Sequence, residues 1–288
     1  MNLTSPSVIA GLCDEFGFKF KKKFGQNFLI NPEIPKKIAT SSVGDARPCA
    51  CIEIGPGAGS LTVELASLYD KVTAFEIDEQ LIPVLEKTLA EHSNVTVINR
   101  DILEVDLKKY IEENFDGYSV TVCANLPYYI TTPIVMQLFE SGARLDRIVV
   151  MMQKEVAQRL VAKAGSADYG AITPTVQYYA KTTRLFDVAP GNFMPRPDVT
   201  STVVCFDIHK EKPVTPISEE YLSRTIKGAF ALRRKTLQNS LATEFGGLSK
   251  SELAECIEEA GISPSARGET LDLKQLSRLS DVLYNKTH

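Results

Sequence analysis

Short apolar runs alternate with amphipathic stretches along the middle of the chain. β-Branched and other apolar residues gather at 50–54, 72–75, 95–98, 119–122 and 148–151, and runs of this length predict five strands. Apolar residues at helical spacing predict helices at 60–69, 80–92, 107–115 and 154–163. The alternation indicates an α/β fold with a Rossmann-like parallel sheet between helices, whose ligand lies beyond the carboxyl ends of the strands.

The last third of the chain has a different pattern. Apolar runs at 185–188 and 202–206 have no long helix between them, so we expect an antiparallel pair at one edge of the sheet. Residues 209–218 contain two prolines and mixed charges, which is typical of a linker. Apolar stripes at helical spacing follow, and Ser249 with Glu252 forms a capping box. We therefore predict a domain over 1–208 that contains the sheet and a small all-helical domain over 209–288.

Composition and charge exclude several classes of protein. The chain has 288 residues, is 44% hydrophobic and carries a formal net charge of −4, which is ordinary for a globular protein and long enough to form a large core. Its six cysteines include no C-x-x-C pair and its three histidines are scattered, so no metal site is predicted and the thiols should be reduced. No apolar stretch could span a bilayer. We expect a cytoplasmic monomer with no membrane partner.

A glycine-rich loop follows the first predicted strand. Gly55, Gly57 and Gly59 form a G-x-G-x-G motif, whereas a dinucleotide motif would have its third glycine where this chain has Ser60. The loop also lacks the Lys-Ser/Thr pair that holds a triphosphate. Glycines allow the backbone to approach a ligand closely, although a loop of this kind can also be a simple turn between a strand and a helix.

Acidic residues end the next two predicted strands. Glu76 lies where an acid accepts hydrogen bonds from ribose hydroxyls, and Asp101 is placed to reach an adenine amino group. Either acid alone could be a solvated charge at a strand end. Together with the glycine loop, they favour S-adenosyl-L-methionine, which contains ribose and adenine but no phosphate.

The fourth predicted strand leads into Asn125-Leu126-Pro127-Tyr128. An adenine N6 amine is a poor nucleophile because its lone pair is delocalised into the ring. The Asn125 side-chain oxygen and the Leu126 carbonyl could accept its two N–H bonds, Pro127 would keep these acceptors rigid, and Tyr128 would stack on the base. In isolation the tetrapeptide could also be a proline-containing turn.

Several separate blocks of this sequence resemble the KsgA family of ribosomal RNA adenine-N6 dimethyltransferases. Besides the glycine loop and the tetrapeptide, these blocks are FGQNFL at 24–29, QKEVAQRL at 153–160, NFMPRPDVTS at 192–201 and RRKTLQNSL at 233–241. The resemblance covers nearly the whole chain. It implies a class I methyltransferase sheet that uses S-adenosyl-L-methionine and places two methyl groups on each of two adjacent adenosines in a 16S rRNA hairpin of the small ribosomal subunit or its precursor.

The resemblance also implies roles for individual residues. Asn27 and Leu29 would cover the methionine end of the cofactor, and Phe193 would face Tyr128 across the target adenine. The remaining cofactor-binding residues would be Gly55, Gly57, Glu76, Asp101 and Asn125. Tyr129 departs from the family, in which bacterial relatives often have asparagine, while the four-residue motif before it is intact.

Two groups of basic residues are candidates for RNA contact. One lies within 221–243, an interval that contains no acid, and the other lies among phenylalanines near the amino terminus. The residues are Arg224, Lys227, Arg233, Arg234 and Lys235 in the first group, and Lys21, Lys22 and Lys23 in the second. Either group could instead be a solvated surface.

Two alternative functions share parts of this pattern. A 23S rRNA adenine-N6 methyltransferase of the antibiotic-resistance type has the same tetrapeptide, but the block at 233–241 favours the small-subunit enzyme. A non-catalytic RNA-binding assembly factor, or a transcription factor on the same fold, would not require an intact cofactor site. Methylation of DNA adenine is disfavoured because no separate base-reading module is evident.

Overall fold

The chain forms two compact units in the computed structural model, which describes residues 1–18 and 25–288. The first unit contains Met1–Ala157 and Thr183–Ile208, and the second contains Gln158–Thr182 and His209–His288. The predicted boundary between 208 and 209 is one of the points where the chain passes between units. Residues 158–182, expected in the first domain, belong to the second unit because Tyr178 is buried in its core and the His209 N–H donates to the Tyr179 carbonyl at 2.9 Å.

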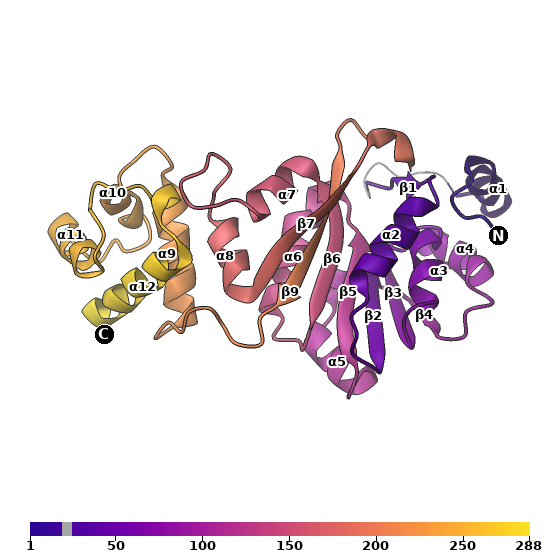
Figure 1. The fold of residues 1–288 in the computed structure, drawn as a ribbon, viewed down its shortest axis with the longest axis horizontal. Coiled ribbons are helices and arrows are strands. Elements are labelled where there is room, and N and C mark those ends of the chain that lie inside the picture. Colours follow the sequence, from indigo (N-terminus) through magenta and orange to yellow (C-terminus); the bar gives the residue numbers. More distant parts are fainter. Residues whose placement is uncertain (19–24) are drawn as a thin grey trace. The chain divides into compact units, whose positions relative to one another are not determined.

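A seven-stranded sheet forms the centre of the first unit, in the order β4-β3-β2-β5-β6-β9-β7 (Figure 1). The pairs from β4 to β6 are parallel, and β6 pairs with β9 in the antiparallel direction. The predicted α/β fold is confirmed, and the two late runs are neighbouring strands at one edge. The strands are β2 (Cys49–Ile54), β3 (Lys71–Glu76), β4 (Val95–Asn99), β5 (Ser119–Asn125), β6 (Arg147–Gln153), β7 (Ala180–Val188) and β9 (Ser201–Ile208).

Helices cover both faces of this sheet. The four predicted helices are present, with ends up to four residues shorter than expected. Other helices in this unit, including the helix after the tetrapeptide, were not predicted. The helices are α1 (Pro6–Phe16), α2 (Glu33–Ser42), α3 (Ser60–Ala66), α4 (Ile82–Thr88), α5 (Leu107–Asn114), α6 (Thr131–Glu140) and α7 (Lys154–Leu160).

Alternation along β9 shows how the two faces are filled. Cys205 packs into a core that includes Ile38 of α2 and Leu65 of α3. The next residue, Phe206, points to the other face, where its ring meets Phe139 of α6 at 5.5 Å between centroids. Successive apolar residues in the strands therefore serve two cores, which explains why the strands read as continuous apolar runs rather than as alternating ones.

A second, two-stranded sheet joins distant parts of the first unit. β1 (Phe28–Leu29) pairs with β8 (Phe193–Met194) in the antiparallel direction, with Leu29 opposite Phe193. The Ile30 N–H also donates to the Asn192 carbonyl at 2.8 Å. Two sequence blocks that resemble the same family are therefore held against each other.

The second unit is helical. Its apolar core gathers side chains from α8 and from the four C-terminal helices. The predicted capping box is confirmed, with the Ser249 Oγ accepting from the Glu252 N–H at 3.2 Å. No helix in the described part of the chain is long and apolar enough to cross a membrane. The helices are α8 (Ile172–Tyr179), α9 (Glu219–Ala231), α10 (Leu237–Leu241), α11 (Lys250–Glu259) and α12 (Leu273–Thr287).

Candidate active site

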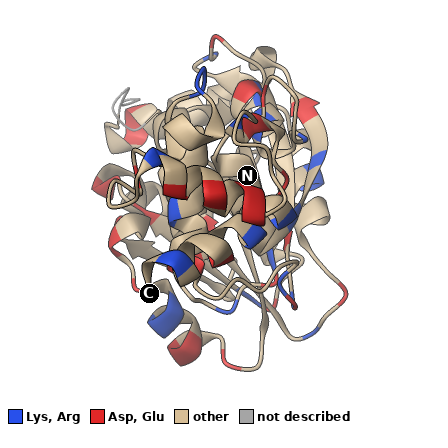
Figure 2. Ribbon diagram, turned by 90° about the vertical axis from the view of Figure 1, so that its left-hand side faces the viewer, with Lys and Arg blue, Asp and Glu red and all other residues tan. Residues whose placement is uncertain are grey.

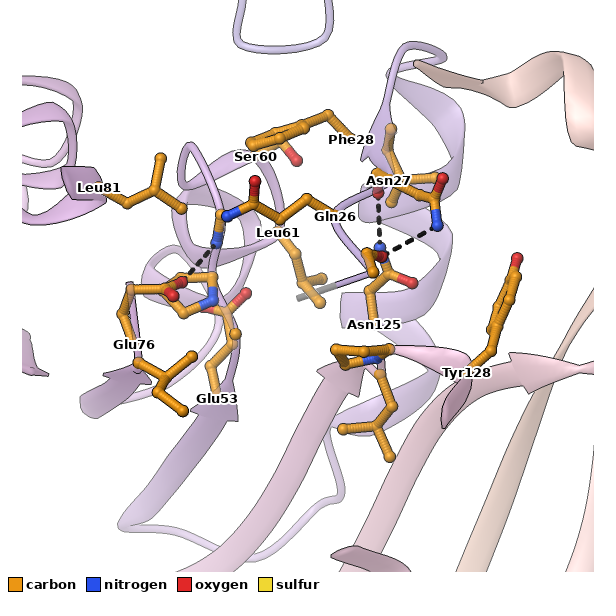
Figure 3. Close-up of a pocket in the computed structure, with 18 residues that line it drawn as sticks. Gln26, Asn27, Phe28, Glu53, Ser60, Leu61, Glu76, Leu81, Asn125 and Tyr128 are labelled. Carbon is orange, nitrogen blue, oxygen red and sulfur yellow. Dashed lines mark hydrogen bonds between the residues drawn. The ribbon is translucent and has the colours of Figure 1, made fainter. Parts of the chain in front are cut away.

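A cavity lies at the carboxyl ends of β2, β3 and β5, where the sequence predicted the ligand (Figure 3). The empty space of the cavity is about 760 Å³, and this volume includes space that is open to solvent. Its wall contains the glycine loop, two glutamates, the segment 25–29 and the tetrapeptide 125–128. The structure thus brings together most of the predicted cofactor-binding and catalytic residues: Asn27, Leu29, Gly55, Gly57, Glu76, Asn125, Leu126, Pro127 and Tyr128.

The glycine loop needs glycine for two reasons. Gly55 and Gly57 have φ angles of 68° and 61°, in the left-handed region that side chains disfavour. A Cβ on Gly57 would also lie 3.1 Å from the Phe28 ring. The backbone of the loop therefore forms part of the cavity wall without side chains between it and a ligand.

Glu76 lines the cavity with its carboxyl group already oriented. Its Oε1 accepts from the Asp78 N–H at 2.8 Å and its Oε2 accepts from the Gly57 N–H at 3.4 Å. Burial raises the pKa of Glu76 to about 7, although these backbone bonds favour the charged form. Asp78 in turn accepts a 2.9 Å bond from the Gln26 Nε2, which ties segment 25–29 to the end of β3.

Glu53 is a second acidic residue of the cavity, and the sequence interpretation gave it no role in the site. Its side chain is only 1% exposed, and its Oε2 has no hydrogen-bond partner among the described residues. Burial, with a smaller contribution from Glu76, raises the pKa of Glu53 to about 8. A lone acid inside an otherwise apolar strand, two residues before the glycine loop, was the signal that could have found it.

Asn125 is held at the other end of the cavity. Its Nδ2 donates to the Asn27 carbonyl at 3.1 Å, and the Asn27 Nδ2 donates to the Gly25 carbonyl at 3.0 Å (Figure 3). Since the nitrogen of the Asn125 amide is used in this way, its oxygen remains available as an acceptor. Leu126 is 1% exposed and its N–H donates to the Met151 carbonyl at 3.2 Å, which fixes the backbone of the tetrapeptide.

The tetrapeptide continues into a short 3₁₀ helix at Tyr128–Ile130. The Pro127 carbonyl accepts from the Ile130 N–H at 3.2 Å and from the Thr131 hydroxyl at 3.0 Å. The Tyr128 hydroxyl lies 2.7 Å from the Ser201 hydroxyl, so its ring is anchored at the tip. Tyr129 is 60% exposed, and its ring atoms lie 3.5 Å from the position of a Cβ on Gly25, a residue of the cavity wall.

Two predicted site residues do not line the cavity. Asp101 lies two residues beyond the end of β4 at Asn99, and its Oδ1 accepts from the Leu103 N–H at 2.9 Å and caps the 3₁₀ helix Ile102–Glu104. Phe193 is 3% exposed and packs in the core of the first unit, opposite Leu29 in the two-stranded sheet. Their contacts with adenine bases stay predictions.

The predicted basic groups are only partly available for RNA. Arg224 lies over the Tyr221 ring at 4.8 Å and donates to the Glu244 carbonyl at 3.1 Å. Lys227 forms a 2.7 Å ion pair with the Glu244 carboxylate, and Arg233 donates to the Ala167 carbonyl at 2.7 Å.

Arg234 and Lys235 are exposed. Figure 2 shows acidic and basic residues interspersed along the ribbon. Lys21, Lys22 and Lys23 lie outside the described residues. Within the described part of the chain, no group of three or more histidine, cysteine, aspartate or glutamate residues could hold a metal ion.

Solved structures with a similar fold include a dimethyladenosine transferase and a 23S rRNA methyltransferase. A dimethyladenosine transferase from Plasmodium falciparum covers 90% of this chain and 97% of its own, with a TM-score of 0.74 and 24% identity. The 23S rRNA methyltransferase ErmE covers 90% of this chain and 100% of its own, with a TM-score of 0.67 and 24% identity. Identities this low show a shared fold and do not choose between the two activities.

Sequence comparison is more specific. A protein named ribosomal RNA small subunit methyltransferase A from Latilactobacillus sakei is 44% identical to this chain, and the match spans 98% of this chain and 96% of that protein. A protein of the same name from Staphylococcus aureus is 46% identical, over 96% of this chain and 94% of that protein. The profile of the family described as ribosomal RNA adenine dimethylase matches residues 17–283. The chain therefore belongs to the ribosomal RNA adenine dimethylase family.

Proposed function

We propose that the protein transfers methyl groups from S-adenosyl-L-methionine to N6 of two adjacent adenosines in 16S rRNA of the small ribosomal subunit or its precursor. The observation that carries this proposal is the orientation of Asn125, whose nitrogen is bonded to the Asn27 carbonyl at 3.1 Å and whose oxygen is left as an acceptor at the cavity. The curated relatives named above carry the same small-subunit assignment. The proposal implies a cytoplasmic protein.

The residues of the cavity fit this cofactor. Glu76 is the candidate partner of the ribose hydroxyls, because it ends β3 with its carboxyl group oriented by two backbone N–H groups. The glycines of the loop have left-handed φ angles and no side chains, which allows the protein backbone to approach the cofactor closely. Asn27 and Leu29, carried on the segment paired through β1, would cover the methionine end. When bound, the cofactor supplies an electrophilic methyl group on a sulfonium.

The tetrapeptide would prepare the amine for attack. The Asn125 Oδ1 and the Leu126 carbonyl would accept the two N–H bonds of the adenine amine, which directs its lone pair away from them and toward the cavity. Buried Leu126 and the hydrogen-bonded Pro127 keep both acceptors in place. The amine proton can leave to water after transfer, so catalysis would depend mainly on position and on exclusion of water.

Replacing Asn125 tests this role. Asn125→Ala removes one acceptor and the bond to Asn27, and we expect methyl transfer to undermethylated small subunits to fall by at least 10². Binding of S-adenosylhomocysteine, measured by calorimetry, should weaken much less. Asn114→Ala at the end of α5 removes a similar side chain away from the cavity and should change neither quantity. An active Asn125→Ala enzyme would refute the proposed mechanism. If the protein were instead a non-catalytic assembly factor, its function would not depend on Asn125.

Arg234 and Lys235 are proposed contacts with the phosphate backbone of the rRNA. Both are exposed, and they follow α9 in the second unit. Guanidinium and ammonium groups that bind phosphates displace the cations condensed on the nucleic acid, which makes binding dependent on salt. Arg224, Lys227 and Arg233 would contribute less, since each is already bonded within the second unit.

A further inference from the structure

Tyr129 carries the most exposed aromatic ring in the described part of the chain. The residue is 60% exposed, whereas every other described phenylalanine and tyrosine is at least partly buried. A single exposed apolar side chain needs no explanation in most places on a protein surface. This one, however, directly follows the tetrapeptide of the candidate active site, so its ring is available to a ligand of that site.

The ring of Tyr129 lies against the wall of the cavity. Tyr128 before it and Gly25 beside it both line the cavity. The Cδ1 and Cε1 atoms of Tyr129 lie 3.5 Å from the position of a Cβ on Gly25, so the backbone of the wall borders one edge of the ring. The Tyr128 hydroxyl is held at 2.7 Å from the Ser201 hydroxyl. The two consecutive tyrosines therefore present one ring to the cavity and one ring to the solvent next to it.

The charge near Tyr129 favours a base over a phosphate. Burial and, to a smaller extent, the Asp101 carboxylate raise the pKa of Tyr129, so this carboxylate lies close enough to act on the ring. The described residues that line the cavity include no lysine, arginine or histidine. A phosphate at this place would be repelled by Asp101, whereas the face of a neutral base can stack on the ring.

The proposed reaction leaves one base without a stacking partner. Adenine must leave its stack to enter the cavity, and this unstacking costs free energy. The adenine next to it then has one uncovered face. An aromatic side chain can cover that face, because every base has a π surface. Two consecutive rings of the protein are thus available for two consecutive bases of the rRNA.

We propose that Tyr129 forms a second base-binding subsite, on which the adenine next to the target adenosine stacks while the target base lies in the cavity. This inference rests on the proposed function. Methylation of N6 leaves the π surface of adenine intact, so the ring accepts the neighbouring base before or after that base is modified. No bond forms or breaks at Tyr129, and its contribution is to the binding of the rRNA.

Two substitutions of Tyr129 test the role of the ring. Tyr129→Leu removes the π surface but keeps an apolar side chain. KM for undermethylated small subunits should rise roughly fivefold or more, while kcat and the affinity for S-adenosylhomocysteine should stay close to those of the unmodified protein. Tyr129→Phe keeps the ring and should retain the lower KM.

Tyr118→Leu is the matched control. It makes the same chemical change directly before β5, at the opposite end of the strand that leads to the tetrapeptide, and outside the cavity wall. It should leave KM, kcat and the affinity for S-adenosylhomocysteine unchanged.

A change in the rRNA identifies the base that stacks. Small subunits can be reconstituted with rRNA in which one or the other of the two adenosines is replaced by uridine, whose single ring offers a smaller surface for stacking. With the unmodified protein, KM for methylation of the remaining adenosine should rise on one or both of these rRNAs. With Tyr129→Leu, this rise should disappear, because the ring that distinguishes the two bases is gone.

Three results would overturn the inference. One is a KM for Tyr129→Leu that equals that of Tyr118→Leu, including the case in which only binding of S-adenosylhomocysteine weakens and Tyr129 belongs to the cofactor site. Another is an equal rise in KM for Tyr129→Phe, which would assign the effect to the hydroxyl. The third is a uridine effect that persists in Tyr129→Leu. If the unmodified protein did not methylate small subunits at all, the proposed function itself would fail, and that outcome is distinct from methylation that does not depend on Tyr129.

Discussion

At the scale of single residues, the site depends on polar groups whose orientation is fixed by neighbours outside the reaction. The Asn125 nitrogen is held by the Asn27 carbonyl, the Glu76 oxygens are held by the Asp78 and Gly57 N–H groups, and the Tyr128 hydroxyl contacts Ser201. Each bond fixes which part of the side chain faces the cavity. Such preorganisation matters most where catalysis depends on position.

Gly57→Ala tests whether the glycine loop contributes to ligand binding as well as to the fold. The φ angle of 61° and the 3.1 Å approach to the Phe28 ring both oppose a side chain. We expect a loss of about 1–3 kcal/mol in the free energy of unfolding, with weaker binding of S-adenosylhomocysteine.

Gly11→Ala in α1 is the control, because a Cβ there meets nothing within 4 Å and φ is not positive. It should leave binding unchanged and stability equal or slightly higher. Thermal denaturation and calorimetry measure both effects. Equal binding by the Gly57→Ala protein would show that the loop is only a turn.

Two substitutions separate the contribution of the Tyr128 ring from that of its hydroxyl. Tyr128→Phe loses the contact with the Ser201 hydroxyl but keeps the surface for stacking, so we expect kcat and KM for the small subunit to change by only a few fold. Tyr128→Ala loses about 1–3 kcal/mol of stacking, which corresponds to a fall of roughly 5- to 160-fold in kcat/KM. Steady-state kinetics of both variants provide the measurement, and similar losses in both would assign the role to the hydroxyl instead.

At the scale of elements, most strands and the helices after them could be predicted because β2, β3, β5, β6 and β9 are buried almost throughout and each helix has an apolar stripe. The short elements could not. β1 and β8 have two residues each, and their pairing depends on contact between positions 28–29 and 193–194, which local pattern does not reveal. The role of residues 158–182 in the second unit was missed for the same reason, since it depends on Tyr178 packing with helices far along the chain.

Gly268 sets the distance between the 3₁₀ helix Gly268–Thr270 and α9. A Cβ at this position would overlap the Ala229 carbonyl oxygen, so the backbone would have to move. We expect Gly268→Ala to destabilise the second unit by about 3 kcal/mol.

Gly247→Ala is the matched control, because a Cβ there meets nothing within 4 Å. Binding of S-adenosylhomocysteine to the cavity of the first unit should survive both substitutions at a temperature where the protein remains folded. Urea denaturation gives the stabilities, and a Gly268→Ala protein as stable as the control would contradict the close approach.

At the scale of the whole molecule, the net charge of the chain was a poor guide to RNA contact, and the local distribution of charge was a better one. The chain carries a formal charge of −4, yet the interval 221–243 contains only basic charged residues. The sequence could not show that Glu244, directly after this interval, engages Arg224 through its carbonyl and Lys227 through its carboxylate. The described basic residues that remain exposed without such bonds are therefore better candidates for RNA contact than the group as a whole.

Removing Arg234 and Lys235 together should change the salt dependence of binding. If both contact phosphates, the slope of log K for small-subunit RNA against log salt should fall by roughly 1.4–1.8, at 0.7–0.9 per contact. Binding of S-adenosylhomocysteine should not change. The double substitution Lys108→Ala with Lys109→Ala on α5 removes the same charge from the first unit and should leave the slope unaltered. Equal slopes in the two double variants would exclude this phosphate contact.

The central claim is that the cavity presents adenine N6 of small-subunit rRNA to a methyl donor. The most direct test incubates the protein with labelled S-adenosylmethionine and undermethylated small or large subunits, then digests each rRNA to nucleosides. We predict labelled N6,N6-dimethyladenosine from the small-subunit rRNA and none from the large. Label on large-subunit rRNA alone, or no labelled adenosine from either, would contradict the account.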